Sequence, residues 1–543
     1  MRRMRVLIAF LALVVVAGAL LLAGCSPSIE RLQRDEQAAK LIERLASDNV
    51  TDRMEAAVAL GELCLRYSPD SLLKDGTRCG DLATPLIGAL EDPHLPVRYA
   101  AMRSLGSLGR NAYEQDSALY ARIADALVEG LLAPDASGGD AASALATIKW
   151  EPEPGEAGAR YYASRGQWDE CARMGPEAAP LLAEALARPN RTTEMIHAAG
   201  DLCARLEDGD LCAPLAAPLV AALRTGQAAS AAYALATVSR GLSADAARAE
   251  IVGAMGAALE RLDPAAPSGG YNDVLAALGQ ARDAGAIPLL VAALPVQTRC
   301  DAELALAQLC GDLDDASLCE QAMEPLGARL AGDCGGRARD ALGSIGPRLA
   351  DATARARVAE LLAADLAERC RARSSGASST ALASLGSDAI QPLKALLSES
   401  EPRCQGLAIE GLAALGPILP EGRQRNEVSQ ILSQLLAFPD LRLQASNALV
   451  AFHREEVPRL LAFLRSPATL YIYRGLITYG VNEAEEALVE ALQRFGDKTM
   501  ALDYVNSGNE ALGAAGRAWA KDNGYIIIPM PGSGGGPAWG SRK

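Results

Sequence analysis

A short helical ending recurs along most of this chain, and its period limits the folds that the chain can adopt. The ending is Leu, then Gly or Ala, then a variable residue and an aliphatic residue, as in Leu105–Leu108. Related endings start at Leu60, Leu105, Leu145, Ala199, Leu235, Leu278, Leu306, Leu342, Leu382, Leu412, Leu449 and Leu476. A period of about 40 residues with two helices per unit is typical of an α-solenoid. The sequence therefore predicts an all-α superhelix of about 12 to 13 helical hairpins.

Each repeat, or tile, also carries signals for a first helix and a turn. In "LEDPHLPVRYAAMRSLGSLG" (Leu90–Gly109), Asp92 and Pro93 break the chain, and Val97, Ala101 and Leu105 then follow helical spacing. First helices elsewhere contain Pro-Leu, as in "AAPLLAEAL" and "AIPLLVAAL". Small residues in the endings permit close packing between second helices, so we expect these helices on the concave side of the superhelix.

The repeat pattern resembles the HEAT family, and specifically the bacterial HEAT-like repeats of the phycobilin-lyase type. The matching residues are Asp92, Val97-Arg98, Ala100-Ala101 and Leu105-Gly106. Tyr161–Leu186 resembles a second unit of that class through Trp168, Cys171, Gly175 and Pro180-Leu181. The resemblance covers roughly residues 36 to 520 and implies the fold, because function depends on sites grafted onto a fold.

The first residues resemble the signal peptide of a bacterial lipoprotein. Arg2, Arg3 and Arg5 precede an apolar run, which ends in Leu22-Ala23-Gly24-Cys25. The likeness to a lipobox implies cleavage before Cys25 and acylation of its sulfur, for example with palmitate. The alternative is an uncleaved transmembrane anchor, because the apolar run is nearly long enough to span a bilayer. We expect an extracytoplasmic, lipid-anchored protein of the cell envelope, on the outer membrane if the cell has one.

These features divide the chain into four predicted parts. Residues 1–24 are the signal peptide, 25–35 a lipid-anchored tether, 36–525 the repeat solenoid and 526–543 a disordered tail rich in Gly, Ser and Pro. Within the last stretch, only "YIIIPMP" has an extended pattern.

Cysteine spacing predicts disulfides that close the loops between tiles. Cys203 and Cys212 are separated by eight residues, as are Cys310 and Cys319, and Cys64 and Cys79 form a longer version. An exported protein permits disulfides; the alternative is six buried thiols. A second series consists of Cys300, Cys334, Cys370 and Cys404, one in each of four consecutive tiles. The distance between neighbouring tiles leaves the pairs Cys300–Cys334 and Cys370–Cys404 open. Cys171 is expected to be a small core residue.

Charge and motifs argue against several functions. The formal net charge is −15 and no basic run occurs, which speaks against nucleic acid as a partner. His94, His197 and His453 lie in separate tiles without metal-ligand spacing, and no phosphate-binding loop or nucleophile elbow is found. A linear ladder of cysteines does not suit tetrahedral zinc. We therefore expect no catalytic site, metal or cofactor. The aromatic cluster of Trp150, Tyr161, Tyr162 and Trp168 is interpreted as packing at a tile junction, with ligand binding as the alternative.

The leading functional prediction is a lipid-anchored scaffold that binds a protein or peptide on its concave face, with the membrane as its second partner. On the helix Val97–Leu108, Arg98, Arg103 and Ser104 are predicted nearer the exposed side, and Arg98 and Arg103 are the candidate contacts. Two alternatives stay open: a lyase or chaperone for a bound chromophore, and a purely structural envelope protein.

Overall fold

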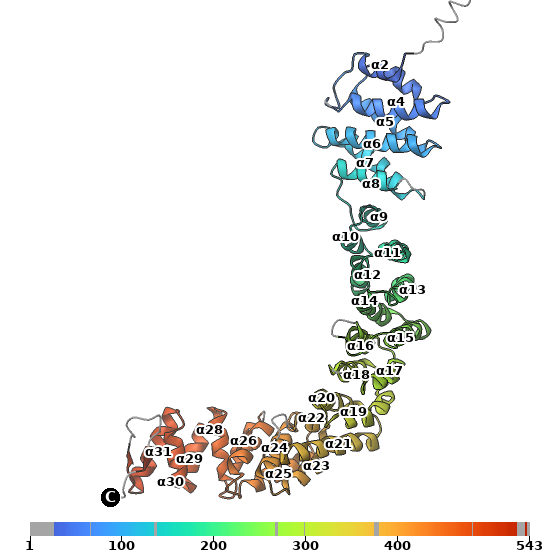
Figure 1. The fold of residues 1–543 in the computed structure, drawn as a ribbon. Helices are drawn as coiled ribbons and strands as arrows, with labels where there is room; N and C mark the ends of the chain where they lie inside the picture. Colours follow the sequence, from blue (N-terminus) through green and yellow to red (C-terminus); the bar gives the residue numbers. More distant parts are fainter. Residues whose placement is uncertain are drawn as a thin grey trace, which may run out of the picture. The chain divides into compact units, whose positions relative to one another are not determined.

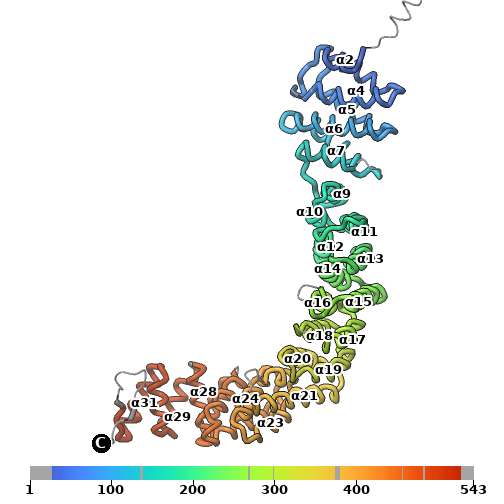
Figure 2. The backbone as a smooth tube through the Cα atoms, in the orientation of Figure 1, coloured from blue at the N-terminus to red at the C-terminus, as the bar shows by residue number. Residues whose placement is uncertain are grey.

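The computed structural model describes residues 27–528, apart from residues 66, 135–137, 267–269, 298, 374–378, 455 and 481, together with residues 538–539. The chain forms two compact units, Met1–Ala244 and Asp245–Lys543, called unit 1 and unit 2. In each unit, helical pairs follow one another in chain order (Figure 1), and the backbone trace moves from tile to tile without returning (Figure 2). This arrangement confirms the prediction of an all-α solenoid.

Unit 1 consists of short helices that pair along the chain. Its α-helices are α2 (Ile29–Arg34), α3 (Ala38–Arg44), α4 (Val50–Leu63), α5 (Ala83–Gly88), α6 (Leu95–Ala112), α7 (Ser117–Leu132), α8 (Gly138–Thr147), α9 (Glu156–Ser164), α10 (Trp168–Arg173), α11 (Ala178–Ala187), α12 (Thr193–Arg205), α13 (Ala213–Ala222) and α14 (Ala228–Gly241). Its 3₁₀ turns are η1 (Cys79–Leu82), η2 (Ala89–Glu91) and η3 (Gly209–Cys212).

Unit 2 repeats this organisation and ends in a small strand pair. Its α-helices are α15 (Asp245–Leu259), α16 (Tyr271–Gln280), α17 (Ala286–Ala293), α18 (Asp301–Asp312), α19 (Met323–Arg329), α20 (Gly335–Ile345), α21 (Ala352–Arg371), α22 (Thr380–Ala383), α23 (Ile390–Leu397), α24 (Pro402–Ala414), α25 (Arg423–Leu435), α26 (Arg442–Phe452), α27 (Val457–Phe463), α28 (Tyr473–Thr478), α29 (Glu485–Phe495), α30 (Lys498–Val505) and α31 (Glu510–Asp522). Its 3₁₀ turns are η4 (Ala316–Ala322), η5 (Gly346–Arg348), η6 (Gly386–Ala389), η7 (Leu470–Ile472) and η8 (Asn482–Ala484).

The recurring endings bring the second helices of neighbouring tiles into direct contact. In unit 1, α4 packs on α6 and α6 on α8; in unit 2, α16 packs on α18 and α24 on α26. A Cβ atom on Gly106 would lie 3.1 Å from the Cα atom of Ala144, and one on Gly279 would lie 2.7 Å from the Cα atom of Ala305. The small second residue of the ending is therefore required for the observed closeness of these helices.

The first residue of each ending and a Leu one or two positions after the Pro of the first helix form the core between the two helices of a tile. Fully buried examples include Leu86, Leu105, Leu145, Leu215, Leu235, Leu290, Leu393, Leu412 and Leu460. Because every tile buries this set against its neighbours, the core is a continuous row of aliphatic side chains within each unit.

The two ends of the described chain differ from the predicted boundaries. Part of the predicted tether, residues 25–35, is helical, because α2 packs on α4 through the buried side chain of Leu32. In the predicted disordered tail, β1 (Ile527–Ile528) pairs antiparallel with β2 (Ala538–Trp539). Those four residues therefore form a strand pair instead of a disordered segment, and residues 529–537 and 540–543 lie outside the described residues. No described helix combines the length and the apolar character needed to cross a membrane.

Candidate functional site

A groove of about 600 Å³ lies across three consecutive second helices of unit 1, α4, α6 and α8. We call it the unit 1 groove. It is lined by Met54, Val58, Pro96, Tyr99, Ala100, Arg103, Ser107, Asp140, Ser143, Ala144 and Thr147. Aliphatic, aromatic, hydroxyl and charged groups are thus present on one surface, as is typical of surfaces that bind proteins.

The tile register explains why these side chains share one face. Val58, Arg103 and Ser143 each precede the first residue of their ending by two positions, and Ser107 and Thr147 follow it by two. Positions four apart lie on the same side of a helix. Since the first residue of the ending points into the core, the flanking positions line the surface between adjacent tiles.

Arg103 is the basic residue of the unit 1 groove, and Asp140 is the acidic one. The side chain of Arg103 is exposed, and among the described residues no ion pair is found for its guanidinium group. An arginine in this state offers planar hydrogen-bond donors to a carboxylate and a flat face to an aromatic ring. The prediction that Arg103 faces the exposed side of the second helices agrees with this placement.

Arg98 occupies a different environment, which corrects its predicted placement on the exposed side. Its side chain is half-buried, and Nη1 donates a 2.6 Å hydrogen bond to the backbone carbonyl of Asp92, six residues earlier. Arg98 therefore holds the turn before α6 in place and does not line the groove.

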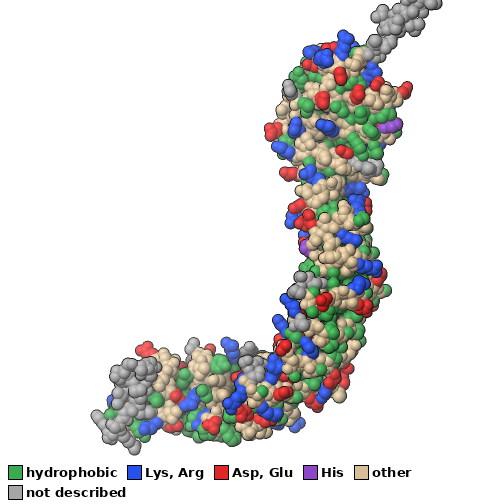
Figure 3. Space-filling view, in the orientation of Figure 1, with side chains coloured by type: hydrophobic (Ala, Val, Ile, Leu, Met, Phe, Trp, Pro, Cys, Tyr) green, Lys and Arg blue, Asp and Glu red, His purple; other side chains and the backbone are tan. Residues whose placement is uncertain are grey.

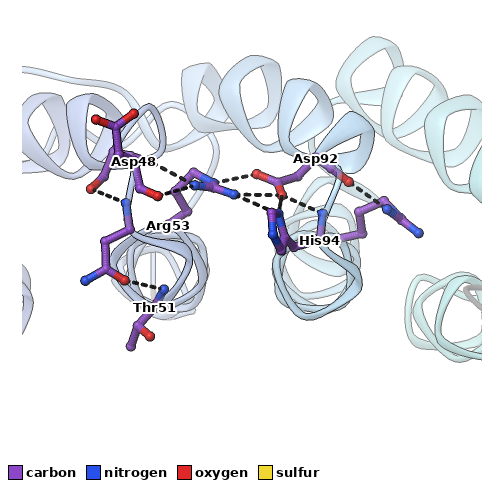
Figure 4. A network of polar contacts seen from close by, with 8 residues as sticks. Asp48, Thr51, Arg53, Asp92 and His94 are labelled. Atoms are coloured by element: carbon purple, nitrogen blue, oxygen red, sulfur yellow. Dashed lines mark hydrogen bonds and ion pairs between the residues drawn. The ribbon is translucent and has the colours of Figure 1, made fainter.

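The same turn receives a second arginine from the preceding tile (Figure 4). Arg53 of α4 donates from Nε to Asp92 Oδ2 at 2.6 Å and from Nη2 to Asp92 Oδ1 at 3.1 Å. It also lies 3.2 Å from His94 Nδ1 and donates to the carbonyls of Ser47 and Asp48. The hydrogen bonds from Arg53 hold the pKa of Asp92 below its ordinary value. This network joins two tiles at their turns.

The bond from an arginine to the carbonyl six residues earlier recurs, and we call it the turn staple. It occurs for Arg53, Arg98, Arg355, Arg425 and Arg442, with the carbonyls of Ser47, Asp92, Leu349, Leu419 and Leu436. Arg355 also pairs with Asp388 of the next tile at 2.8 Å. The position of each arginine after its turn can be read from the sequence, but only the structure shows that its guanidinium group bonds to the carbonyl six residues earlier.

Ser104 is also placed differently from the prediction. Its side chain is buried, and Oγ donates to the carbonyl of Ala57 at 2.8 Å. Ser104 directly precedes the first residue of its ending, and this position faces the neighbouring second helix. Ser104 is therefore shielded from solvent, because α4 covers that flank of α6.

The structure joins all five predicted cysteine pairs, including the two left open by the sequence. The disulfides are Cys64–Cys79, Cys203–Cys212, Cys300–Cys334, Cys310–Cys319 and Cys370–Cys404. The Cα atoms of Cys300 and Cys334 are 5.3 Å apart, as are those of Cys370 and Cys404. Cys300 and Cys334 directly precede α18 and α20, whereas Cys370 lies in the last turn of α21 and Cys404 in the first turn of α24. Cys171 is buried and unpaired, and burial raises the pKa of its thiol to about 11. Cys25 lies outside the described residues.

A serine, a histidine and a carboxylate meet in the interior of unit 2. His453 Nε2 lies 2.8 Å from Ser429 Oγ, and His453 Nδ1 lies 3.4 Å from Glu456 Oε1. Both Ser429 and His453 are buried, and Glu456 also accepts hydrogen bonds from Arg425 and Arg459. A nucleophilic serine needs an open path to its substrate, so this trio stabilises the packing of α25 against α26 and α27. Sequence reasoning missed it, since the three side chains come from two tiles.

The aromatic cluster agrees with packing at a tile junction. The ring centroids of Trp150 and Tyr161 are 5.4 Å apart in an edge-to-face contact, and Tyr161 contacts Tyr162 in the same way. Tyr161 is buried. In the part of the chain that the structure describes, no group of three or more His, Cys, Asp or Glu side chains is arranged to hold a metal ion.

No family model and no curated protein matches the sequence. Solved structures with similar helical repeats include importin beta, at 14% identity over 91% of this chain and 75% of that chain, with a TM-score of 0.34. The Kap95:Nup1 complex gives 14% identity over 90% of this chain and 69% of that chain, with a TM-score of 0.35. An engineered protein gives 19% identity over 76% of this chain and 98% of its own, with a TM-score of 0.28. With TM-scores this low, no property of those proteins is transferred to this chain.

Proposed function

We propose that this chain is a non-enzymatic scaffold, lipid-anchored outside the cytoplasm, that binds a protein or peptide partner in the unit 1 groove. Helical-repeat folds commonly present such extended binding surfaces. The observation that carries the proposal is the exposed Arg103 beside Tyr99 in a groove formed by three tiles.

The chemistry of the groove defines the class of partner. Met54, Val58 and Tyr99 supply apolar contact area, while Arg103 supplies a charge that favours a carboxylate. Hydroxyl groups of Ser143 and Thr147 lie on the same surface and suit hydrogen bonding to an extended backbone. An extended or helical peptide segment with an acidic residue fits this lining.

Site-specific photocrosslinking in intact cells tests the location of the partner. A photoreactive residue at Arg103 is expected to capture a defined protein, whereas the same residue at Arg122 is not. Arg122 is the matched outer position, because it is exposed on first helix α7 of unit 1. Adducts formed only from position 122 would move the binding surface to the first helices.

Charge reversal then tests the role of Arg103. Arg103→Glu should lower the affinity for the captured partner about tenfold or more. Arg110→Glu is the matched control, because Arg110 is exposed on the same helix but does not line the groove. Equal losses from both variants would contradict a specific contact at Arg103. Arg98 is unsuitable for this test, because its substitution removes a turn staple.

The membrane part of the proposal rests on Cys25 and the preceding apolar run. Mass spectrometry of the native protein should find Cys25 as the first residue with acyl chains attached, and Cys25→Ser should prevent both cleavage and acylation. An uncleaved and unmodified N-terminus would refute the lipid anchor.

A further inference from the structure

The loop closed by Cys64 and Cys79 is the most apolar exposed segment near the start of the described chain. Leu72 is 65% exposed, and Leu65 and Tyr67 of the same loop are 42% and 40% exposed. A single exposed leucine is ordinary, but three large apolar side chains in one disulfide-closed loop require an explanation.

This loop has a defined conformation. Leu72 and Arg78 form an antiparallel bridge, and Leu73 donates to the carbonyl of Thr77 at 2.9 Å. Gly76 takes the left-handed conformation, with φ of 84°, that closes the turn. Leu73 is buried while Leu72 points outward, as the alternation of a strand requires. We call residues Leu72–Arg78 the terminal hairpin.

The terminal hairpin is attached to the first helices of unit 1. Asp75 Oδ2 accepts a 2.8 Å hydrogen bond from the backbone N–H of Ala39, and Lys74 pairs with Glu36 at 3.3 Å. Glu36 and Ala39 lie in and just after the turn between α2 and α3. Figure 1 shows α2 at the end of unit 1 where the described chain begins. The hairpin therefore belongs to the terminal layer of the solenoid.

The proposed anchor lies close to this layer along the chain. Cys25 precedes Ile29, the first residue of α2, by only four positions. Four residues span at most about 14 Å when fully extended. Because α2 packs on α4, this short connection holds the whole terminal layer near the plane in which the acyl chains are inserted.

We propose that the terminal hairpin docks on the lipid bilayer, with Leu72 entering the interface between headgroups and acyl chains. The inference rests on the lipid anchor at Cys25, which supplies the proximity, and it adds a second, non-covalent contact. Two membrane signals bind more stably than one. A docked hairpin would also restrict the orientation of the first tiles relative to the bilayer.

Local charge indicates the kind of bilayer. Among the described residues up to Cys79, the exposed basic side chains are Arg31, Arg34, Lys40, Lys74 and Arg78, and the exposed acidic ones are Glu30, Asp35, Glu43, Asp48, Glu55, Glu62 and Asp70. Space-filling Figure 3 shows basic and acidic side chains together at this end of unit 1. No basic excess is present that would require an anionic lipid, so apolar contact drives docking, and zwitterionic phosphatidylcholine is a sufficient surface.

Quenching by brominated lipid tests the contact directly. Acylated full-length protein carrying Leu72→Trp is reconstituted in phosphatidylcholine vesicles with bromine on the acyl chains, and the wild-type tryptophan signal is subtracted. The added emission should fall to about half of its value in vesicles without bromine, because the side chain reaches the acyl boundary. Leu318→Trp is the matched control, since Leu318 is 45% exposed in the analogous Cys310–Cys319 loop of unit 2. Its emission should not change.

A second measurement needs no added tryptophan. Trypsin can cleave after Lys74 and Arg78, and cleavage there should be about tenfold slower on vesicles than in detergent if the hairpin is docked. Leu72→Asp should restore fast cleavage while the Cys64–Cys79 disulfide stays intact by non-reducing peptide mapping.

The outcomes separate the anchor from the docking. If acylated protein floats with vesicles but the Leu72→Trp variant shows no quenching and trypsin cleaves at full rate, docking is wrong while the anchor stands. If the native protein carries no acyl group and does not float, the anchor is wrong and the docking inference fails with it.

Discussion

Unit 1 and unit 2 are built from the same tile but differ in what they bury. Among the described residues, the buried polar side chains of unit 1 are Ser104 and Ser239, whereas those of unit 2 are Gln297, Glu303, Asp365, Ser379, Ser429, Ser446 and His453. Both units keep the small residues of the endings and the turn staples. The tile thus tolerates either an apolar interior or a polar one, provided that the polar groups are paired.

The polar interior of unit 2 is arranged in short networks. Glu303 forms a 3.0 Å ion pair with Arg329 and contacts Gln297, which in turn accepts from the N–H of Ala302 at 2.9 Å. Asp365 pairs with Arg339 at 3.0 Å and with Arg369 at 2.7 Å. These networks tie second helices to first helices through buried carboxylates. In unit 1, the ion pair of Arg44 with Asp52 also links a first helix to a second helix, but its side chains are partly exposed.

The grooves of the two units differ in the charge of their lining. A groove of about 520 Å³ in unit 2 lies on α24 and α26 and is bordered by Tyr479. It contains Glu410 at the tile position that Arg103 occupies in unit 1, and Asn447 occupies that position in the next tile. The common frame therefore presents groups of opposite charge at equivalent positions in the two units.

Reduction of the disulfides should give the largest difference between the units. Unit 1 has disulfides with sequence separations of 15 and 9 residues, and unit 2 has separations of 34, 34 and 9. The chain-entropy model gives a loss of about 6 kcal/mol for unit 1 and about 10 kcal/mol for unit 2. Hydrogen exchange with mass spectrometry, followed separately for peptides of each unit, should show unit 2 opening first as reductant is added. Earlier opening of unit 1 would reverse the comparison.

Removing a buried charge should have the next largest effect. Glu303→Ala leaves Arg329 and Gln297 without their partner, and loss of one member of a buried pair costs about 3 kcal/mol or more. Denaturant unfolding monitored by hydrogen exchange should show this loss in unit 2 only. Ser104→Ala is the matched change in unit 1, and its expected cost is about 1 kcal/mol, since one hydrogen bond to the Ala57 carbonyl is lost. A Glu303 variant no worse than Ser104→Ala would show that the network contributes little.

Mild acid should destabilise unit 2 more than unit 1, with a smaller effect than the two changes above. Burial lowers the pKa of His453, so the folded state binds its proton less readily than the unfolded chain does. Stability from this group is therefore complete above the ordinary pKa of about 6.5 and declines as the pH falls below it. Between pH 7 and pH 5, unit 2 should therefore lose stability through His453, because the unfolded chain takes up the proton at a higher pH than the folded state does. His453→Gln should flatten that slope, and an unchanged slope would assign the pH dependence to other groups.

At lower pH both units should lose stability, so strong acid does not distinguish unit 1 from unit 2. Burial raises the pKa of Glu456, but hydrogen bonds from Arg425, His453 and Arg459 lower it further, to about 2. In unit 1, hydrogen bonding from Arg53 lowers the pKa of Asp92. Carboxylates of this kind stabilise the fold above their unfolded pKa, and the contribution is lost as the pH falls toward the folded value.

The sequence was sufficient to predict the helical repeat, but it did not show which side chains lie between neighbouring tiles. Endings such as Leu105–Leu108 identified the second helices, because the small residue has a direct packing consequence that repeats. Cysteine pairs were recognisable for the same reason, since equivalent positions recur in several tiles. Ser104 and Arg98 were misplaced because a single helix does not reveal which flank the neighbouring tile covers. The unit 1 groove and the buried networks of unit 2 depend on residues from separate helices, as Ser429 and His453 are, and no local pattern joins them.

The five disulfides also give the chain an unusual response to mechanical force. A solenoid pulled from its two ends can yield one tile after another, because each tile is held mainly by its neighbours. The segments enclosed by Cys300–Cys334 and Cys370–Cys404 cannot lengthen in this way, and each withholds about 120 Å of contour length. An array tethered at one end and loaded at the other would therefore stretch in short steps and stop well before its full contour, as a spring with built-in limits does.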